Sequence, residues 1–325
     1  MNTPVDPRPL VTIIVPGRDV AGFATEALAS LRAQTFAAWR AILVDDGSAD
    51  ATGEVFAEAA ASDARFTVVR HGAPRGLGAA RNTGLDLVST PFVGFLDADD
   101  VMVPRAIERL IGAIDASGSD IVVGAYVRLR PGPDGRYAPG PVQPWVAAAT
   151  APARQGTTLA EHPEVSGNIV AWSKLSRVEL WRAHGLRFAE DRLYEDQIVA
   201  QRLYVHARAI DVIPDVVVQW RERADGSSIT QRKDALPVLA DYLDALRGGI
   251  AVLDAAGQRA AARARIRLIL DMDTPPLVRI AQQHADDAYR RAVSALVREL
   301  SARAEHESVA LDAAGADLRS AAALW

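Results

Sequence analysis

The chain has 325 residues and a mass of 34.7 kDa, enough for one large domain with an appendage. Its formal net charge of −5 argues against general nucleic-acid binding, and the absence of cysteine excludes disulfides, thiolate metal sites and cysteine nucleophiles. Residues 1–10 lack the apolar core of a signal peptide, and no stretch of about 20 uncharged apolar residues could span a bilayer. We therefore expect a cytoplasmic protein, with a position at the inner face of the membrane as the alternative.

Apolar segments that read as buried strands alternate with helices in the first hundred residues. The predicted strands are 11–15, 40–44, 66–69 and 91–96, and the predicted helices are 21–34, 51–61 and one that opens within 76–84. This alternation predicts βαβ units and a mostly parallel sheet. Because ligands of such sheets bind beyond the carboxyl ends of the strands, four polar groups should share one edge: Pro16-Gly17, Asp45-Asp46, Arg81 and Asp97–Asp99.

The second half of the chain is less regular. It predicts a helix at 107–114, a strand at 120–127, a long irregular loop at 131–160, helices at 172–183 and 197–206, a short strand pair at 211–220 and a polar loop at 221–230. From 236 onward the pattern is helical, with breaks expected at Gly248-Gly249, Gly257 and Thr274-Pro275-Pro276. We therefore expect a subdomain boundary near 232.

Three carboxylates end the strand predicted at 91–96. Asp97, Asp99 and Asp100 crowd within four residues, and unpaired carboxylates placed so close together repel one another unless a cation or its ligand lies between them. Alternatively, the segment is an acidic turn that caps the helix beginning near Pro104. Asp46 has the same ambiguity, since it either caps the next helix or accepts hydrogen bonds from a nucleobase.

Two further polar groups have a structural and a functional interpretation. The glycines around Arg81 either allow a tight turn or let backbone N–H groups and Arg81 approach phosphates. Glu195 and Asp196 are either helix-capping acids or a catalytic pair, and both roles are compatible because a helix N-terminus keeps a carboxylate ionised. Four arginines of one alanine-rich helix read as a solvated face, or as a contact with an anionic polymer or membrane surface: Arg259, Arg263, Arg265 and Arg267.

Taken together, the motifs resemble those of the family 2 glycosyltransferases, which have the GT-A fold. The resemblance rests on Val11-Thr12-Ile13-Ile14-Val15-Pro16, Leu43-Val44-Asp45-Asp46-Gly47-Ser48, Gly78-Ala79-Ala80-Arg81-Asn82-Thr83-Gly84 and Phe95-Leu96-Asp97-Ala98-Asp99-Asp100. Later motifs are similar to wall teichoic acid glycosyltransferases and to the glycosyltransferase-like domains of polyol-phosphate polymerases: Trp172-Ser173-Lys174-Leu175, Tyr194-Glu195-Asp196 and Ser228-Ile229-Thr230. The resemblance covers about residues 10–232. It implies a nucleotide-sugar-binding half (1–104), an acceptor and catalytic-base half (105–232) and a C-terminal helical subdomain (233–325).

The resemblance also implies roles for individual residues. Pro16 and Asp46 would line a uracil pocket, Arg81 would lie near the nucleotide, and Asp97 would face the ribose and diphosphate. Asp99 would hold Mn²⁺ or Mg²⁺, which leaves Asp100 as the expected helix cap. Asp196, within the Glu195-Asp196 pair, matches the catalytic base, and Arg221 and Arg223 would help to neutralise the diphosphate. Arg18 departs from the family pattern, which has an aromatic residue there, although a guanidinium can stack on a base or reach a phosphate.

These roles predict an inverting, metal-dependent glycosyltransferase that moves a sugar from a UDP-sugar to an acceptor hydroxyl, for example on a cell-surface polymer such as teichoic acid. The alternatives are a glycosyltransferase acting on a small natural product or a peptide, and a non-catalytic module that binds a sugar nucleotide or polymer and assists a polymerase. Nucleotidyl transfer would require a phosphate-binding glycine loop after the first strand, which Pro16-Gly17-Arg18-Asp19 does not supply. We also expect peripheral membrane contact and self-association through the C-terminal helices.

Overall fold

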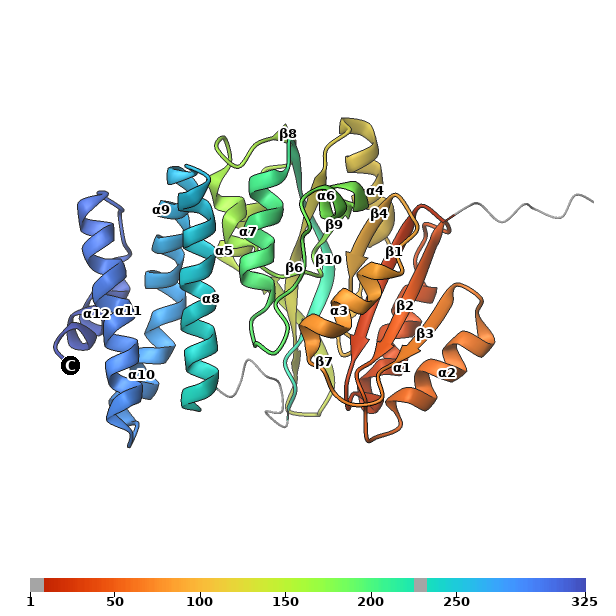
Figure 1. The fold of residues 1–325 in the computed structure, drawn as a ribbon, viewed down its shortest axis with the longest axis horizontal. Coiled ribbons are helices and arrows are strands. Elements are labelled where there is room, and N and C mark those ends of the chain that lie inside the picture. The colour runs from red at the N-terminus through yellow and green to blue at the C-terminus, as the bar shows by residue number, and fades with distance from the viewer. Residues whose placement is uncertain (1–8, 225–232) are drawn as a thin grey trace, which may run out of the picture.

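A computed structural model describes residues 9–224 and 233–325 of the chain. A long sheet lies at the centre, helices pack on it, and a group of C-terminal helices lies at one end of the molecule (Figure 1). Within the described residues the strand order is β3-β2-β1-β4-β9-β6-β10-β5, with β7 paired to β6 and β8 to β10. The predicted α/β class with a helical C-terminal region is confirmed.

The first half of the sheet is parallel, as its sequence predicts. β1 (Val11–Gly17) lies between β2 (Trp39–Asp45) and β4 (Phe92–Phe95), and β3 (Phe66–Arg70) pairs with the outer side of β2. Every residue of β1 is buried, which explains why these strands read as continuous apolar runs. Three helices connect the strands: α1 (Ala21–Arg32), α2 (Thr52–Ser62) and α3 (Leu77–Asp86).

The second half of the sheet mixes directions. β9 (Lys174–Arg177) is antiparallel to both β4 and β6 (Ile121–Pro131), and it joins the two halves. Beyond β6 lie β10 (Ile210–Arg221), which is parallel to it, and the short β5 (Val101–Met102), which is antiparallel to β10. The helices of this half are α4 (Ala106–Ser117), α6 (Val178–Ala183) and α7 (Asp196–His206).

The prediction of an irregular loop at 131–160 is wrong. It contains β7 (Tyr137–Val142), α5 (Pro144–Thr150) and β8 (Arg154–Thr157). Both strands are largely exposed, and within the described part of the chain each pairs with one neighbour, so neither carries the alternating apolar pattern that marks a half-buried strand. Pairing with β6 and β10 therefore supplies order that the local sequence does not encode.

Two other local predictions fail for a related reason. The expected helix at 172–183 is β9 followed by the short α6, because pairing of Leu175 with Gly94 inserts the segment into the sheet. The expected strand pair at 211–220 is the single long strand β10, which continues past register shifts between Ile213 and Val218. The Ser228-Ile229-Thr230 motif lies outside the described residues.

The C-terminal region is helical, as predicted. Its helices are α8 (Leu236–Ala255), α9 (Arg259–Leu268), α10 (Thr274–Gln283), α11 (Asp287–His306) and α12 (Ala316–Ala323), and a π-helical turn, Ile269–Asp273, joins α9 to α10. They enclose a second apolar core, separate from the core around the sheet. Among the residues the structure describes, no helix combines the length and apolar character needed to cross a membrane.

Two expectations about these helices are corrected. Gly248-Gly249 lies within α8 and does not interrupt it. A Cβ on Gly248 would lie 2.5 Å from the Ile198 side chain, so the glycine lets α8 approach α7 closely. Arg265 is not solvated. It is buried and donates to Gln197 Oε1 over 2.9 Å, and it also pairs with Asp273.

Candidate active site

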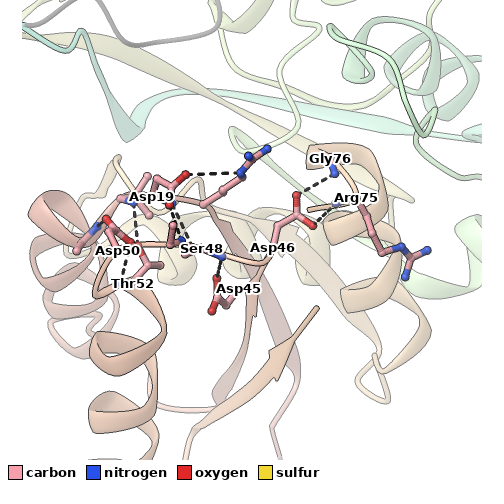
Figure 2. A network of polar contacts seen from close by, with 12 residues as sticks. Asp19, Asp45, Asp46, Ser48, Asp50, Thr52, Arg75 and Gly76 are labelled. Atoms are coloured by element: carbon pink, nitrogen blue, oxygen red, sulfur yellow. Dashed lines mark hydrogen bonds and ion pairs between the residues drawn. The ribbon is translucent and has the colours of Figure 1, made fainter. Parts of the chain in front are cut away.

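Asp46 anchors the loop that opens α3. It follows β2 directly and is 3% exposed, and its Oδ1 accepts hydrogen bonds from Arg75 N (2.8 Å) and His71 Nδ1 (2.7 Å), while Oδ2 accepts from Gly76 N (2.8 Å). Figure 2 shows the carboxylate turned toward this loop. Asp46 therefore does not cap α2, whose N-cap position is Ala51.

The ends of β1, β2 and β4 meet beside Asp46. Asp46 N donates to Gly17 O over 2.9 Å, and Ala98 N donates to Pro16 O over 3.2 Å. The sheet thus brings Pro16 and Asp46 to the edge that carries Asp97, as the strand order requires. Arg18 lies just beyond β1; its side chain is 53% exposed and pairs with Asp19 over 3.6 Å.

Arg81 links the two halves of the domain. Its Nη2 donates to Asp97 Oδ1 over 2.7 Å, its Nη1 donates to Glu195 Oε1, and its side chain is 2% exposed. Burial alone would lower the pKa of Arg81, but Asp97 and Glu195 more than offset it, and the pKa is raised. Arg81 therefore lies behind the carboxylates and holds them, and both ends of its guanidinium are occupied before any phosphate arrives.

Two arginines, Arg221 at the end of β10 and Arg223 just beyond it, contact Asp99 and Asp100. Arg223 donates to Asp99 Oδ2 from Nε (2.8 Å), and its Nη2 lies 2.7 Å from the same oxygen. Arg221 donates to Asp99 O from Nε (2.7 Å) and to Glu26 Oε2 from Nη2 (2.6 Å). Asp100 Oδ1 accepts from Arg221 N over 2.8 Å, and its buried Oδ2 has no hydrogen-bond partner among the residues that the structure describes.

These contacts correct the role expected for Asp100. It does not cap α4, whose N-cap position is Arg105 with no capping side-chain bond. β5 lies between Asp100 and that helix, and it turns the carboxylate toward β10. Burial raises the pKa of Asp100 well above its usual value, and the neighbouring Asp99 and Asp97 add to the effect.

Glu195 and Asp196 stand at the N-terminus of α7. Glu195 occupies the N-cap position but makes no side-chain capping bond, and Asp196 is the first helical residue. Burial raises the pKa of Glu195 to about 7, against the opposing charge of Arg81. Burial also raises the pKa of Asp196, while Arg81 and Lys174 act to lower it. Burial thus shifts both carboxylates in the same direction, and the neighbouring cations oppose the shift, which is the kind of perturbation found at functional sites.

The carboxylates of Asp97, Asp99 and Asp100 are suitable ligands for a hard divalent cation, because Mg²⁺ and Mn²⁺ prefer carboxylate oxygens. Among the described residues, however, no group of three or more His, Asp or Glu side chains could hold a metal by itself. Asp97 is already bound by Arg81 and Asp99 by Arg223. The described residues can therefore contribute only part of a coordination sphere, and a bound ligand could supply further oxygens.

The sequence motifs assign no role to several residues of this site. His71 bridges Asp46 and Thr83, with 3.0 Å between Nε2 and Thr83 Oγ1, and Glu26 of α1 pairs with Arg221. Lys174, which lies in the Trp172-Ser173-Lys174-Leu175 motif but received no role from it, lines a small pocket together with Asp196. His71 and Glu26 act through partners far away in the sequence, so no local pattern identifies them.

The chain is similar to known proteins over most of its length. Residues 12–167 match the family model described as glycosyl transferase family 2. The chain is 32% identical over 230 residues to the uncharacterized glycosyltransferase EpsJ of Bacillus subtilis, a match that covers 70% of this chain and 65% of EpsJ. It is 31% identical over 117 residues to WfgD of Escherichia coli, a UDP-Glc:alpha-D-GlcNAc-diphosphoundecaprenol beta-1,3-glucosyltransferase, covering 36% of this chain and 46% of WfgD.

The fold is similar to that of a solved structure as well. S. aureus TarS 1-349 in complex with UDP-GlcNAc superposes with a TM-score of 0.70 at 20% identity, covering 89% of this chain and 81% of that one. This likeness confirms the expected GT-A fold. The chain spans between one third and about two thirds of the length of the first curated relatives it matches.

Proposed function

We propose that this chain, whose residues 12–167 match the glycosyl transferase family 2 model, transfers a sugar from a UDP-sugar to an acceptor hydroxyl with inversion at the anomeric carbon. The observation that carries this proposal is Arg81, which links Asp97 of the first half to Glu195 of the second. It draws the nucleotide-facing acids and the candidate base Asp196 into one site at the carboxyl edge of the sheet.

In this proposal Asp196 is the catalytic base. Its carboxylate takes the proton of the acceptor hydroxyl while that oxygen forms a bond to the anomeric carbon. The bond from that carbon to the diphosphate oxygen breaks, and UDP leaves with the bonding electron pair. One base and a single in-line displacement, with no covalent sugar–enzyme intermediate, invert the configuration. General-base catalysis of this kind contributes about 10²- to 10⁴-fold.

The remaining residues bind and orient the donor. Asp46 and Pro16 line the nucleobase pocket, and the exposed Arg18 can stack on the base or reach a phosphate. Asp97 faces the ribose and diphosphate, with Arg81 and Glu195 positioning it from behind. Arg223, supported by Arg221, brings positive charge to the diphosphate side.

The proposal includes a divalent cation at Asp99. Mn²⁺ or Mg²⁺ bound there would neutralise charge on the departing diphosphate. Asp99 would hold it on the part of its carboxylate that Arg223 leaves accessible, and the diphosphate would complete the coordination.

The acceptor in this reaction supplies a hydroxyl group. A hydroxyl of a cell-surface saccharide or polymer, such as a teichoic acid, is our first choice, since WfgD acts on a lipid-linked saccharide by its name. A small natural product or a peptide would serve the same site. Peripheral membrane contact, a cytoplasmic location and self-association through the C-terminal helices stay predictions.

A screen for UDP release tests the proposal. Purified protein with a panel of UDP-sugars and Mn²⁺ should hydrolyse one donor slowly or bind UDP in a metal-dependent way. Asp196→Asn should lower turnover about 10²- to 10⁴-fold and leave UDP affinity within about twofold, since Asp196 lies on the acceptor side. Asp191→Asn is the matched control, because Asp191 is an exposed acid of the segment before α7. Unchanged turnover in Asp196→Asn would favour the non-catalytic module or another base.

A further inference from the structure

Lysine is almost absent from this chain. Arginine supplies 34 of the 36 basic residues, and only Lys174 and Lys233 are lysine. Lys174 is 5% exposed and lies on β9, the strand that joins the two halves of the sheet. A lysine kept at a buried position in so arginine-rich a chain calls for an explanation, because an ammonium is costly to remove from water.

Among residues 9–224 and 233–325, the hydrogen-bond partners of the Lys174 ammonium are all neutral groups. Nζ donates to Asn168 O (3.1 Å), to Asn168 Oδ1 (3.0 Å) and to Val170 O. Its Nζ also lies 5.6 Å from the centre of the Tyr204 ring. These contacts fix the segment that leads into β9, yet none of them balances the positive charge.

Asp196 is the carboxylate that shares a pocket with Lys174. The two are the charged residues that line this small pocket, whose other walls are mostly apolar side chains such as Phe95, Trp181 and Phe188. Burial lowers the pKa of Lys174 to about 7, and the carboxylate of Asp196 acts to raise it. The same attraction acts to lower the pKa of Asp196.

A charge count shows why a second cation is needed. Three carboxylates meet at this point, Asp97, Glu195 and Asp196, and Arg81 supplies one positive charge, already shared between two of them. The titratable and charged groups around Asp196 come from several elements: Arg81, Lys174, Asp97, Glu195, Tyr126 and Tyr194. Only Arg81 and Lys174 among these are cations.

We propose that Lys174 is a positioning residue of the active site, whose buried ammonium fixes residues 168–170 and supplies the second positive charge that keeps Asp196 ionised. This inference rests on the proposed function only where it makes Asp196 the base; the pairing of Lys174 with Asp196 can be tested without any turnover. Lys174 touches neither donor nor acceptor in this arrangement and acts through Asp196.

The first test is a lysine titration by NMR. Protein labelled with ¹³C at lysine Cε gives two lysine signals, which Lys233→Arg assigns. We expect the Lys174 signal to titrate near pH 7, and Asp196→Asn to lower its midpoint by about one pH unit, since an opposite charge at close range shifts a pKa by about 1–3 units. A midpoint that does not move in Asp196→Asn would overturn the proposal, whether or not the protein is an enzyme.

The second test uses the pH dependence of kcat for the donor found active. Lys174→Met should move the acidic limb of the profile up by about one pH unit, with the KM of the donor within about twofold, and Lys174→Arg should restore much of the wild-type position. Arg177→Met is the control, because it removes another cation of β9 that donates to Ser119 O. If Lys174→Met lowers the melting temperature but leaves the acidic limb of the kcat profile in place, Lys174 only stabilises the local structure. That result would overturn the proposal. An inactive wild-type protein would instead count against the proposed function.

Discussion

Arg223 binds Asp99 through two nitrogens: Nε donates to Oδ2 over 2.8 Å, and Nη2 lies 2.7 Å from the same oxygen. The guanidinium thus holds a position on the carboxylate that the proposed cation also needs. A hydrogen bond to a charged group is typically worth about 1.5–3 kcal/mol net, and a cation that displaced Arg223 from this oxygen would have to offset that loss. Donor binding can shift that competition, because the diphosphate offers Arg223 an alternative anionic partner.

Replacing Arg223 should therefore strengthen binding of the metal alone. We expect Arg223→Gln to bind Mn²⁺ about tenfold more tightly in the absence of nucleotide, as measured by electron paramagnetic resonance. Asp99→Asn should abolish this binding. Arg18→Gln removes an exposed guanidinium of the same edge and should leave the affinity unchanged. Weaker Mn²⁺ binding by Arg223→Gln would show that Arg223 supports the cation and does not compete with it.

Glu195 should make stability depend on pH in a specific direction. Burial raises its pKa from an ordinary 4.5 to about 7 in the folded protein, so the folded state binds this proton more tightly than the unfolded state. Stability contributed by the protonated form is present at low pH and is lost as pH rises from about 4.5 to about 7. The loss has an upper bound of about 3.5 kcal/mol, at about 1.4 kcal/mol for each pKa unit.

Thermal melts at several pH values test this expectation. The melting temperature of the wild type should fall more between pH 5 and pH 7.5 than that of Glu195→Gln, which cannot ionise. Glu54→Gln provides the comparison, since Glu54 is an exposed acid on α2. Parallel curves for the wild type and Glu195→Gln would contradict the raised pKa.

His71 should position Asp46 for the donor. Its Nδ1 lies 2.7 Å from Asp46 Oδ1, and its Nε2 lies 3.0 Å from Thr83 Oγ1. His71→Leu leaves a buried carboxylate short of one donor, a loss of roughly 1–3 kcal/mol, and should weaken UDP binding about tenfold. His71→Asn retains an N–H donor near the same place and should recover most of the affinity. Titration calorimetry with UDP measures both, and an effect on kcat with unchanged UDP affinity would rule out this role.

The parts of the fold that the sequence predicts are those that local burial determines. β1, β2 and β4 are covered on both faces, so their residues form continuous apolar runs that identify the strands. The strand order then places Asp46 and Asp97 at one edge without further information. β9 could not be found in this way, because what makes it a strand is its pairing with β4 and β6.

The same limit applies to the site. Resemblance identifies Arg81 and Glu195 as separate motif residues, but not the ion pair that joins them across 114 positions. It also gives no reason for Asp100 to turn toward Arg221 N, since the intervening β5 forms only by pairing with β10. Local sequence patterns therefore do not predict those side-chain contacts of the site that depend on tertiary packing.

Gly78 should be essential for the approach of α3 to the second half of the domain. A Cβ at this position would lie 1.9 Å from Ala189 O and 3.4 Å from Glu195 Cγ. Alanine is favoured over glycine in a helix by about 1 kcal/mol, but a contact this short with backbone cannot be relieved without moving α3. Displacing α3 would also strain the bond between Asn82 Nδ2 and Phe188 O, now 3.0 Å.

The steric cost of a Cβ at position 78 should exceed the gain in helix propensity. We expect Gly78→Ala to lower the free energy of unfolding by about 1–3 kcal/mol, the usual cost of overpacking, and to reduce turnover because Glu195 loses its place beside Arg81. Gly22 offers a matched control: like Gly78 it is the second residue of its helix, but a Cβ there would meet nothing within 4 Å. Gly22→Ala should therefore stabilise the protein by up to about 1 kcal/mol. Urea denaturation of both variants decides the matter, and equal stabilisation by the two substitutions would mean that the two halves are free to separate at this contact.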